Sequence, residues 1–444
     1  MRSELFERLS IPKLMAHCVL PGTVSMVASS LYIVVDGMFV GHYMGHDSLA
    51  AANLMWPLLG ILFAIADMIA YGSSVQISMF LGRRSRLSAS RTFSFCVWVL
   101  FGFSAVAGLL GYFLTEPFLM LVGAGEDTAR LGKEYIISYC VSAPLVMLFF
   151  ATDSYLRVCG RQKFSMWLRV FTSLFNLLLD YIFIVLLRQG IWSASFTTCV
   201  TLSLGTLIAF YPFLRRRMDV EFVRGRIRFK QFTRLCYNGV TELLQSVSGS
   251  VFMLVANTMM LSLGGTVAVA AHAAVLYIDS VAIRVLMGTV NSLQPALSYC
   301  YGAALYARVA AVEKWLLSLC ALLFLLTAGP LIIPYYAADG DEEFIIMGRR
   351  CIVIFAFTYL TGWVEICLHG FLTALDSPSR AFVLSLCRAL LLPLPLLLLL
   401  KHCYGLDGVW STHAVTCAVA ALLSVALTLP FWRNKISSRL PLPS

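Results

Sequence analysis

The sequence of 444 residues has little charge. Asp, Glu, Lys and Arg make up 13% of it, and hydrophobic residues make up 59%. Soluble globular proteins carry about 25% charged and about 45–50% apolar residues, so this composition excludes a soluble globule. It also excludes a disordered chain, because disorder requires low hydrophobicity together with high net charge. The composition therefore predicts a membrane protein.

The sequence also lacks the short motifs of common catalytic and metal sites. It contains no Walker A loop, no H-E-x-x-H helix and no G-x-S-x-G elbow, which serve nucleotide binding, zinc binding and nucleophilic attack. Its 13 Cys are scattered singly, without a C-x-x-C pair, and a free Cys in an apolar run behaves as a small hydrophobe. We therefore predict no enzyme, no disulfide framework and no cofactor beyond a coupling ion.

Most of the sequence consists of long apolar runs separated by short charged segments. A helix needs about 20 apolar residues to cross the bilayer core, and twelve runs meet this requirement. We therefore predict an all-α integral membrane protein with twelve transmembrane helices. The first run exceeds the about 7–15 apolar residues of a signal peptide, so we expect it to be retained as a span. The predicted spans are 14–41, 47–80, 92–114, 134–155, 164–187, 190–213, 233–262, 267–300, 315–336, 350–372, 381–400 and 408–432.

Basic residues are distributed unevenly between the loops on the two sides of these spans. With the N-terminus inside, 24 of the 33 Lys and Arg lie in inner segments and six lie in outer loops. Positively charged loops stay on the cytoplasmic side, so we predict that both termini are cytoplasmic. The net charge of +10 is then explained by contact with anionic lipid, and no nucleic-acid partner is expected.

The most basic loop, 214–232, divides the predicted spans into six and six. A shift of 220 residues pairs identical residues over two helices and their loop without a gap, which indicates an internal repeat. We predict two pseudo-symmetric six-helix lobes, an N-lobe at 1–213 and a C-lobe at 233–444, joined by a cytoplasmic linker loop at 214–232. The paired residues are Gly45 with Gly265, Ala50 and Ala51 with Ala270 and Ala271, Ser78 with Ser298, and Gly82 with Gly302.

Carboxylates inside the predicted spans are candidates for function, because each costs about 2.5–3.5 kcal/mol on insertion scales. Asp36 lies in the outer half of the first span, 15 residues after Pro21, which should bend that helix. Asp180 lies in the fifth span, with Asn176 one turn before it. Glu242 lies near the inner end of the seventh span. For each acid, a structural hydrogen-bonding role between helices is the alternative.

Other charged residues within the spans are expected to serve structure. Asp153 lies close enough to the cytoplasmic end of its span to reach the interface. Buried arginines neutralise acids or extend their long side chains to an interface. The sequence assigns no partners to the remaining charged residues, which are Asp67, Asp279, Glu365, Arg284 and Arg388.

Acids of this kind can carry a coupling ion. A proton that crosses the membrane on a carboxylate releases about 2.3 kcal/mol per 100 mV of membrane potential. The same oxygens, together with the amide of Asn176, suit a hard cation such as Na+, which would sit at Asp36 and Asp180. The residues therefore leave H+ and Na+ open. The polar side chains expected to line a substrate cavity are Glu242, Asn257, Gln294 and Asn53.

Five segments carry a resemblance that covers nearly the whole chain in order. The sequence is similar to the multidrug and toxic compound extrusion (MATE) family, and within it to a MepA-like, DinF-related bacterial branch. The segments are VDGMFVGHYMGHDSLAAANL (35–54), LRVCGRQKFSM (156–166), NLLLDYIFI (176–184), LQPALSYCYGA (293–303) and GLDGVWSTHAV (405–415).

This resemblance implies a two-lobed antiporter that exports cationic amphipathic drugs, driven by an inward H+ or Na+ gradient. Asp36 matches the cation-binding acid of the family's first span, and Pro21 matches its bend proline. Asp180 and Asn176 match the pair that completes this site, and Glu242 matches an acid of some members. An Asp that some sodium-coupled members carry in span ten is replaced here by Gly362, with Glu365 nearby. This departure favours coupling through the N-lobe by protons.

We therefore expect a monomeric multidrug efflux antiporter in a bacterial cytoplasmic membrane, with the lipid bilayer and small cationic molecules as its partners. The alternative is a flippase for lipid-linked oligosaccharides, which would share the two-lobed plan. Such a protein needs a basic cavity for its pyrophosphate headgroup, whereas the charges within these spans are mainly acidic. A membrane scaffold or enzyme would leave the buried acids and the repeat unexplained.

Overall fold

The structure is a computed structural model that describes residues 2–44, 46–121, 126–327 and 342–439. Every regular element within these ranges is helical. The helices are α1 (Leu5–Arg8), α2 (Ile11–Phe39), α3 (His46–Gly82), α4 (Arg86–Leu121), α5 (Glu126–Val158), α6 (Gln162–Asp180), α7 (Trp192–Leu214), α8 (Phe229–Gly302), α9 (Tyr306–Thr327), α11 (Glu342–Ala356), α12 (Thr358–Ala374), α13 (Pro378–Leu386), α14 (Pro393–Tyr404) and α15 (Leu406–Phe431).

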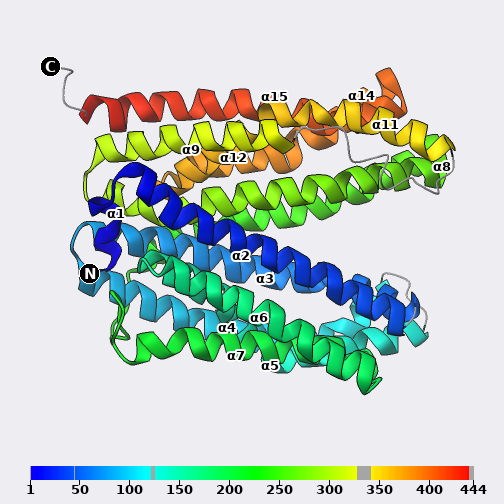
Figure 1. The fold of residues 1–444 in the computed structure, drawn as a ribbon, viewed down its shortest axis with the longest axis horizontal. Coiled ribbons are helices and arrows are strands. Elements are labelled where there is room, and N and C mark those ends of the chain that lie inside the picture. The colour runs from blue at the N-terminus through cyan, green and yellow to red at the C-terminus, as the bar shows by residue number, and fades with distance from the viewer. Residues whose placement is uncertain (1, 45, 122–125, 328–341, 440–444) are drawn as a thin grey trace.

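Most predicted spans coincide with a helix that can cross a membrane. Among the described residues, eight helices are long and apolar enough, and α11 with α12, bent by 44°, makes a ninth. Of the remaining predicted spans, 233–262 and 267–300 both lie within α8, and 315–336 begins in α9 and ends outside the described residues. Figure 1 shows α1 and the end of α15 at the same end of the bundle, as an even number of spans requires.

Gly265 divides α8 into two antiparallel halves. Its φ of 65° lies in the left-handed region that favours glycine, and its ψ of −162° is not helical. Both ends of α8 lie along α3, because a Cβ added at Gly72 would overlap the carbonyl oxygen of Leu235, and one at Gly82 would overlap that of Tyr299. The element is therefore a helical hairpin, which agrees with the two separate spans predicted there.

The contact between α3 and the second half of α8 repeats itself with the residues exchanged. A Cβ at Gly82 would overlap the carbonyl oxygen of Tyr299, and one at Gly302 would overlap that of Met79. The side chain of Asn291 donates to the hydroxyl of Tyr71 at 3.3 Å. Tyr71 and Asn291 are themselves 220 residues apart. The same shift converts Gly82 into Gly302 and Met79 into Tyr299, so it turns the first glycine contact into the second. The contact between α3 and the second half of α8 therefore has the local two-fold symmetry expected of a repeat. The lobe boundaries at 213 and 233 stay predictions.

The close packing of α3 against the first half of α8 predicts an effect of glycine substitution on stability. Gly72→Val would push the new side chain against the backbone of Leu235, so α3 and α8 must separate. Overpacking of this kind costs about 1–3 kcal/mol. We expect a lower melting temperature for the purified protein. Gly60→Val is the control, since a Cβ at Gly60, in the same helix, meets nothing within 4 Å. Equal melting temperatures for the two variants would contradict the close packing of Gly72 against the first half of α8.

The segment before α2 joins both halves of the chain at the end that carries the termini. From the first half, the backbone N–H of Ser3 donates to Asp219 Oδ2 at 2.7 Å, and Arg84 pairs with Glu7 at 2.8 Å. From the second half, Arg308 Nε donates to the carbonyl oxygen of Phe6 at 2.7 Å. This segment therefore holds the two halves together at that end, whereas Figure 1 shows the helices diverging toward the opposite end.

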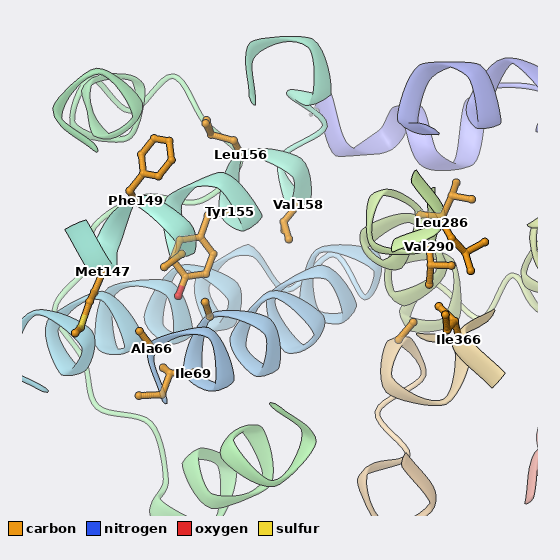
Figure 2. Packing of buried hydrophobic residues seen from close by; sticks show 14 of the residues in the cluster. Ala66, Ile69, Met147, Phe149, Tyr155, Leu156, Val158, Leu286, Val290 and Ile366 are labelled. Atoms are coloured by element: carbon orange, nitrogen blue, oxygen red, sulfur yellow. The ribbon is translucent and has the colours of Figure 1, made fainter. Parts of the chain in front are cut away.

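Buried side chains pack in both halves of the bundle, as Figure 2 shows for residues of α3, α5, α8 and α12. Tyr155 is 1% exposed and points from α5 toward α3, where its hydroxyl shares a 2.8 Å hydrogen bond with Ser73. Val290 of α8 lies beside Ile366 of α12 in the other half. These contacts fix the helices that carry the polar sites described next.

Candidate ion-coupling and substrate sites

Two neighbouring helices, α2 and α6, carry the acids predicted to couple an ion. Pro21 lies inside α2, which runs on from Ile11 to Phe39, and it deprives the helix of one backbone donor. The predicted bend stays a prediction. Asp180 is the last residue of α6, where the π-helical turn Tyr181–Leu186 begins. Such turns are rare and are frequent at functional sites.

Asp180 is fully buried and hydrogen-bonded on both oxygens. The hydroxyl of Thr197, on α7, donates to its Oδ1. With its carboxamide turned so that both ends are satisfied, Asn176 donates to Asp180 Oδ2 at 3.2 Å and accepts from the backbone N–H of Thr198 at 3.3 Å. The i, i+4 spacing of Asn176 and Asp180 that indicated this pair is thus realised, with α7 supplying two further donors.

Asp36 lies near this pair with an unsatisfied oxygen. Its Oδ1 is buried and has no hydrogen-bond partner among the described residues, and its carboxylate interacts electrostatically with Asp180. Tyr32, one turn before Asp36, interacts with both acids. A buried oxygen without a partner is costly, so a proton or a cation held between the two acids would stabilise the site. The structure thus brings Asp36, Asp180 and Asn176 together; their coupling role stays a prediction.

A narrow cavity opens beside this site in the first half of the chain. Asn176 joins the cavity to the acids, because it lines the cavity and hydrogen-bonds to Asp180. The described lining contains hydroxyls, aromatic rings and one formal charge, that of Arg169. The lining residues are Ser29, Tyr32, Phe149, Phe150, Arg169, Thr172, Ser173, Asn176, Thr198, Thr201 and Leu202.

Asp153 belongs to a buried ion cluster that the sequence did not predict. Its side chain is 1% exposed and pairs with both Arg157 and Arg169, and it accepts from Ser165. The side chain of Asp153 is therefore enclosed between helices, and its depth in the membrane stays a prediction. The spacing of Asp153 and Arg157, i and i+4 on one helix, was the available signal. Arg169 comes from a different helix, so no local pattern could have found it.

A second narrow cavity lies in the second half of the chain. Glu242 and Gln294 line it, and their role in binding substrate stays a prediction. Asn257 lies on α8 but lines neither of the two cavities within the described part of the chain, and the side chain of Asn53 is outside the described residues. Further lining residues are Gln245, Met287, Val290, Asn291, Ile366, His369, Gly370, Thr373 and Arg388.

The structure shows the surroundings of the charged residues to which the sequence assigned no partner. Arg388 pairs with Glu365, which confirms that an arginine neutralises a buried acid, whereas Arg284 is exposed. Asp279 is 4% exposed and interacts with Tyr359. Asp67 interacts electrostatically with Asp153, Arg169 and Glu242.

Sequence reasoning missed Glu313, which is 1% exposed and has no partner for either oxygen among the described residues.

Comparison with known proteins identifies relatives across the whole chain. A family model described as MatE matches residues 21–182 and again residues 239–399. Together these matches cover more than half of the chain. The multidrug export protein MepA of Staphylococcus saprophyticus is 23% identical over 435 residues, which cover 95% of each chain.

Solved structures share the arrangement of the helices. The MATE multidrug transporter DinF-BH has a TM-score of 0.86 and 26% sequence identity, with 98% of this chain and 99% of that chain covered. A MATE protein crystallised with MaD3S has a TM-score of 0.90 and 20% identity, with 98% of both chains covered. These likenesses confirm the predicted all-helical, multi-span membrane fold.

Proposed function

The chain belongs to the MatE family, whose members are multi-pass membrane transporters and not enzymes, and from this premise we propose that it is a secondary-active multidrug efflux antiporter. It exports cationic amphipathic compounds from the bacterial cytoplasm and takes up H+, or Na+, in exchange. The relative named a multidrug export protein supports export of drugs. The observation that carries ion coupling is the unpartnered Oδ1 of Asp36 beside Asp180.

Ion coupling at these acids follows from their surroundings. Two interacting carboxylates in a site of low polarity repel each other when both are charged, so binding of one H+ or Na+ relieves the repulsion. Asn176 and Thr197 hold Asp180 in place, whereas Asp36 retains a free oxygen for the ion. Each inward-moving charge contributes about 2.3 kcal/mol per 100 mV. Occupancy of the site thereby favours one packing of α2 against α6.

Alternating access requires the two lobes, 1–213 and 233–444, to separate at one end and close at the other. In the arrangement described, Gly82 and Gly302, the last residues of α3 and α8, lie against the opposite helix. We assign this end to the cytoplasm, because the basic loops and both termini belong to it. Substrate release then occurs at the opposite, diverging end, and Glu242 in the second cavity attracts cationic substrates.

Dye transport into everted membrane vesicles tests this proposal and identifies the coupling ion. In everted vesicles the cytoplasmic face is outside, so an exporter moves a cationic dye into the lumen. We expect accumulation when the lumen is made acidic, and a comparison with vesicles loaded with Na+ at equal pH separates the two ions. Absence of dye movement under either gradient would contradict the proposal and favour the flippase, for which movement of a labelled lipid-linked sugar is the corresponding assay.

A further inference from the structure

We propose that the cavity between α2, α5, α6 and α7 contains an anion-binding subsite at Arg169, which takes a carboxylate or an inorganic anion. Binding of an anion at this subsite does not depend on the proposed ion coupling. The proposed function is needed only for the further step of assigning the anion to the carboxylate of an exported compound. Three features carry the proposal: the unused donors of Arg169, the charge of its cluster, and an unpartnered hydroxyl in the cavity.

Arg169 is held rigidly and keeps most of its donors for the cavity. One terminal nitrogen donates to Asp153 Oδ2 at 3.1 Å, and the other donates to Ser29 Oγ at 3.5 Å. Its guanidinium carbon lies 5.3 Å from the ring centre of Phe149 and 5.6 Å from that of Phe150. A guanidinium has five N–H donors, so three of them have no acceptor within the described part of the chain. A fixed planar group of this kind suits two-point binding of a carboxylate.

The ion-paired part of the cluster around Arg169 contains two positive groups and one negative group. Arg157 and Arg169 share the single carboxylate of Asp153. Asp67 acts on Arg169 electrostatically but forms no ion pair with it among the described residues. Asp67 offsets the charge of Arg169 only through space, whereas a bound anion would accept hydrogen bonds directly from its guanidinium.

The remaining lining of the cavity offers hydroxyl donors and no carboxylate among the described residues. Thr201 is 2% exposed, and its Oγ1, which has no hydrogen-bond partner there, belongs to the cavity lining. Ser29 accepts from Arg169, so its own O–H is available to donate. An oxyanion bound in this cavity could accept from the guanidinium donors of Arg169 and from the unsatisfied hydroxyl of Thr201, which line the same cavity. The second cavity differs, since Glu242 lines it together with Arg388.

Thermal unfolding of the purified protein with benzoate as the probe tests the subsite. Benzoate is expected to raise the melting temperature in a saturable way, whereas benzamide, which has no charge, is expected to leave it unchanged. Arg169→Lys keeps the charge but loses the planar fork, and Thr201→Val keeps the shape but loses the hydroxyl; we expect benzoate affinity to fall about 10-fold and about 3-fold, respectively.

The matched control is Arg388→Lys, because Arg388 is also paired with a buried acid but lines the other cavity. Its benzoate affinity should equal that of the unsubstituted protein. The subsite is excluded if benzoate gives no stabilisation, or if Arg169→Lys and Thr201→Val both bind benzoate with unchanged affinity. Replacing gluconate by chloride in the buffer separates the two sources: stabilisation by chloride assigns the subsite to a free anion, and stabilisation by benzoate alone assigns it to the carboxylate of a bound compound.

Discussion

Asp36→Asn is expected to reduce ion-driven dye efflux to the rate of liposomes without protein. The substitution keeps the size of the side chain but removes the exchangeable charge from the one acid of the site that has an unpartnered oxygen. Asn binds neither a proton at neutral pH nor Na+ with comparable strength, so the gradient loses its coupling group. Asp180 is the less available acid, because Thr197 and Asn176 each donate a hydrogen bond to one of its oxygens.

The measurement is dye uptake into proteoliposomes under an imposed pH or Na+ gradient, with ion movement recorded in parallel. Asp127→Asn is the matched control, since Asp127 is exposed in the first turn of α5, and its efflux should equal that of the unsubstituted protein. Dye binding by the Asp36→Asn protein should persist, because the charge lost is that of the coupling site. Full efflux with full ion coupling in this variant would make the proposed mechanism wrong.

Glu365→Ala is expected to cost about 3–5 kcal/mol of stability, because it leaves the guanidinium of Arg388 buried without its partner. The side chain of Glu365 is 2% exposed and that of Arg388 is 19% exposed. Removing both charges should recover most of the loss, since an apolar pair of similar volume often replaces a buried ion pair without cost. We therefore expect Glu365→Leu combined with Arg388→Met to melt closer to the unsubstituted protein than Glu365→Ala does.

Thermal unfolding of the purified variants measures this effect. Glu116→Ala is the control, because Glu116 pairs with Lys133 at 3.0 Å on the surface, with side chains 54% and 40% exposed. Exposed ion pairs contribute little, so this variant should melt almost as the unsubstituted protein does. A Glu365→Ala protein that melts with the control would show that Arg388 finds another partner or water.

Hydrophobicity and charge in the sequence predicted much of the fold. Apolar length located the helices, since each must satisfy its backbone within the bilayer, and Gly265 falls between two predicted spans, where the hairpin of α8 turns. The 220-residue shift paired Gly82 with Gly302, and in the structure each of these glycines packs against the helix that carries the other. The sequence predicts these features because they depend on local composition or on direct comparison of two segments.

The candidate site was predicted only in part. Asp180 and Asn176 share a helix face, so their spacing alone indicated that they meet, and the cost of a buried charge marked Asp36. The partners Thr197 and Thr198 come from α7, and nothing about a threonine in a span distinguishes it from others. Asn257 was predicted to line a substrate cavity, but it lines neither of the two cavities found among the described residues.

What the sequence by itself determined is a helical membrane protein with few intramembrane acids, because burial in lipid restricts composition at every position. What the tertiary structure decided is which charges meet. Arg169 joins Asp153, and Arg388 joins Glu365, in each case across two helices. Such pairs depend on how packed helices are rotated and at what angle they cross. Many contacts between residues far apart in the sequence determine this geometry, so no spacing along the chain predicts the pairs.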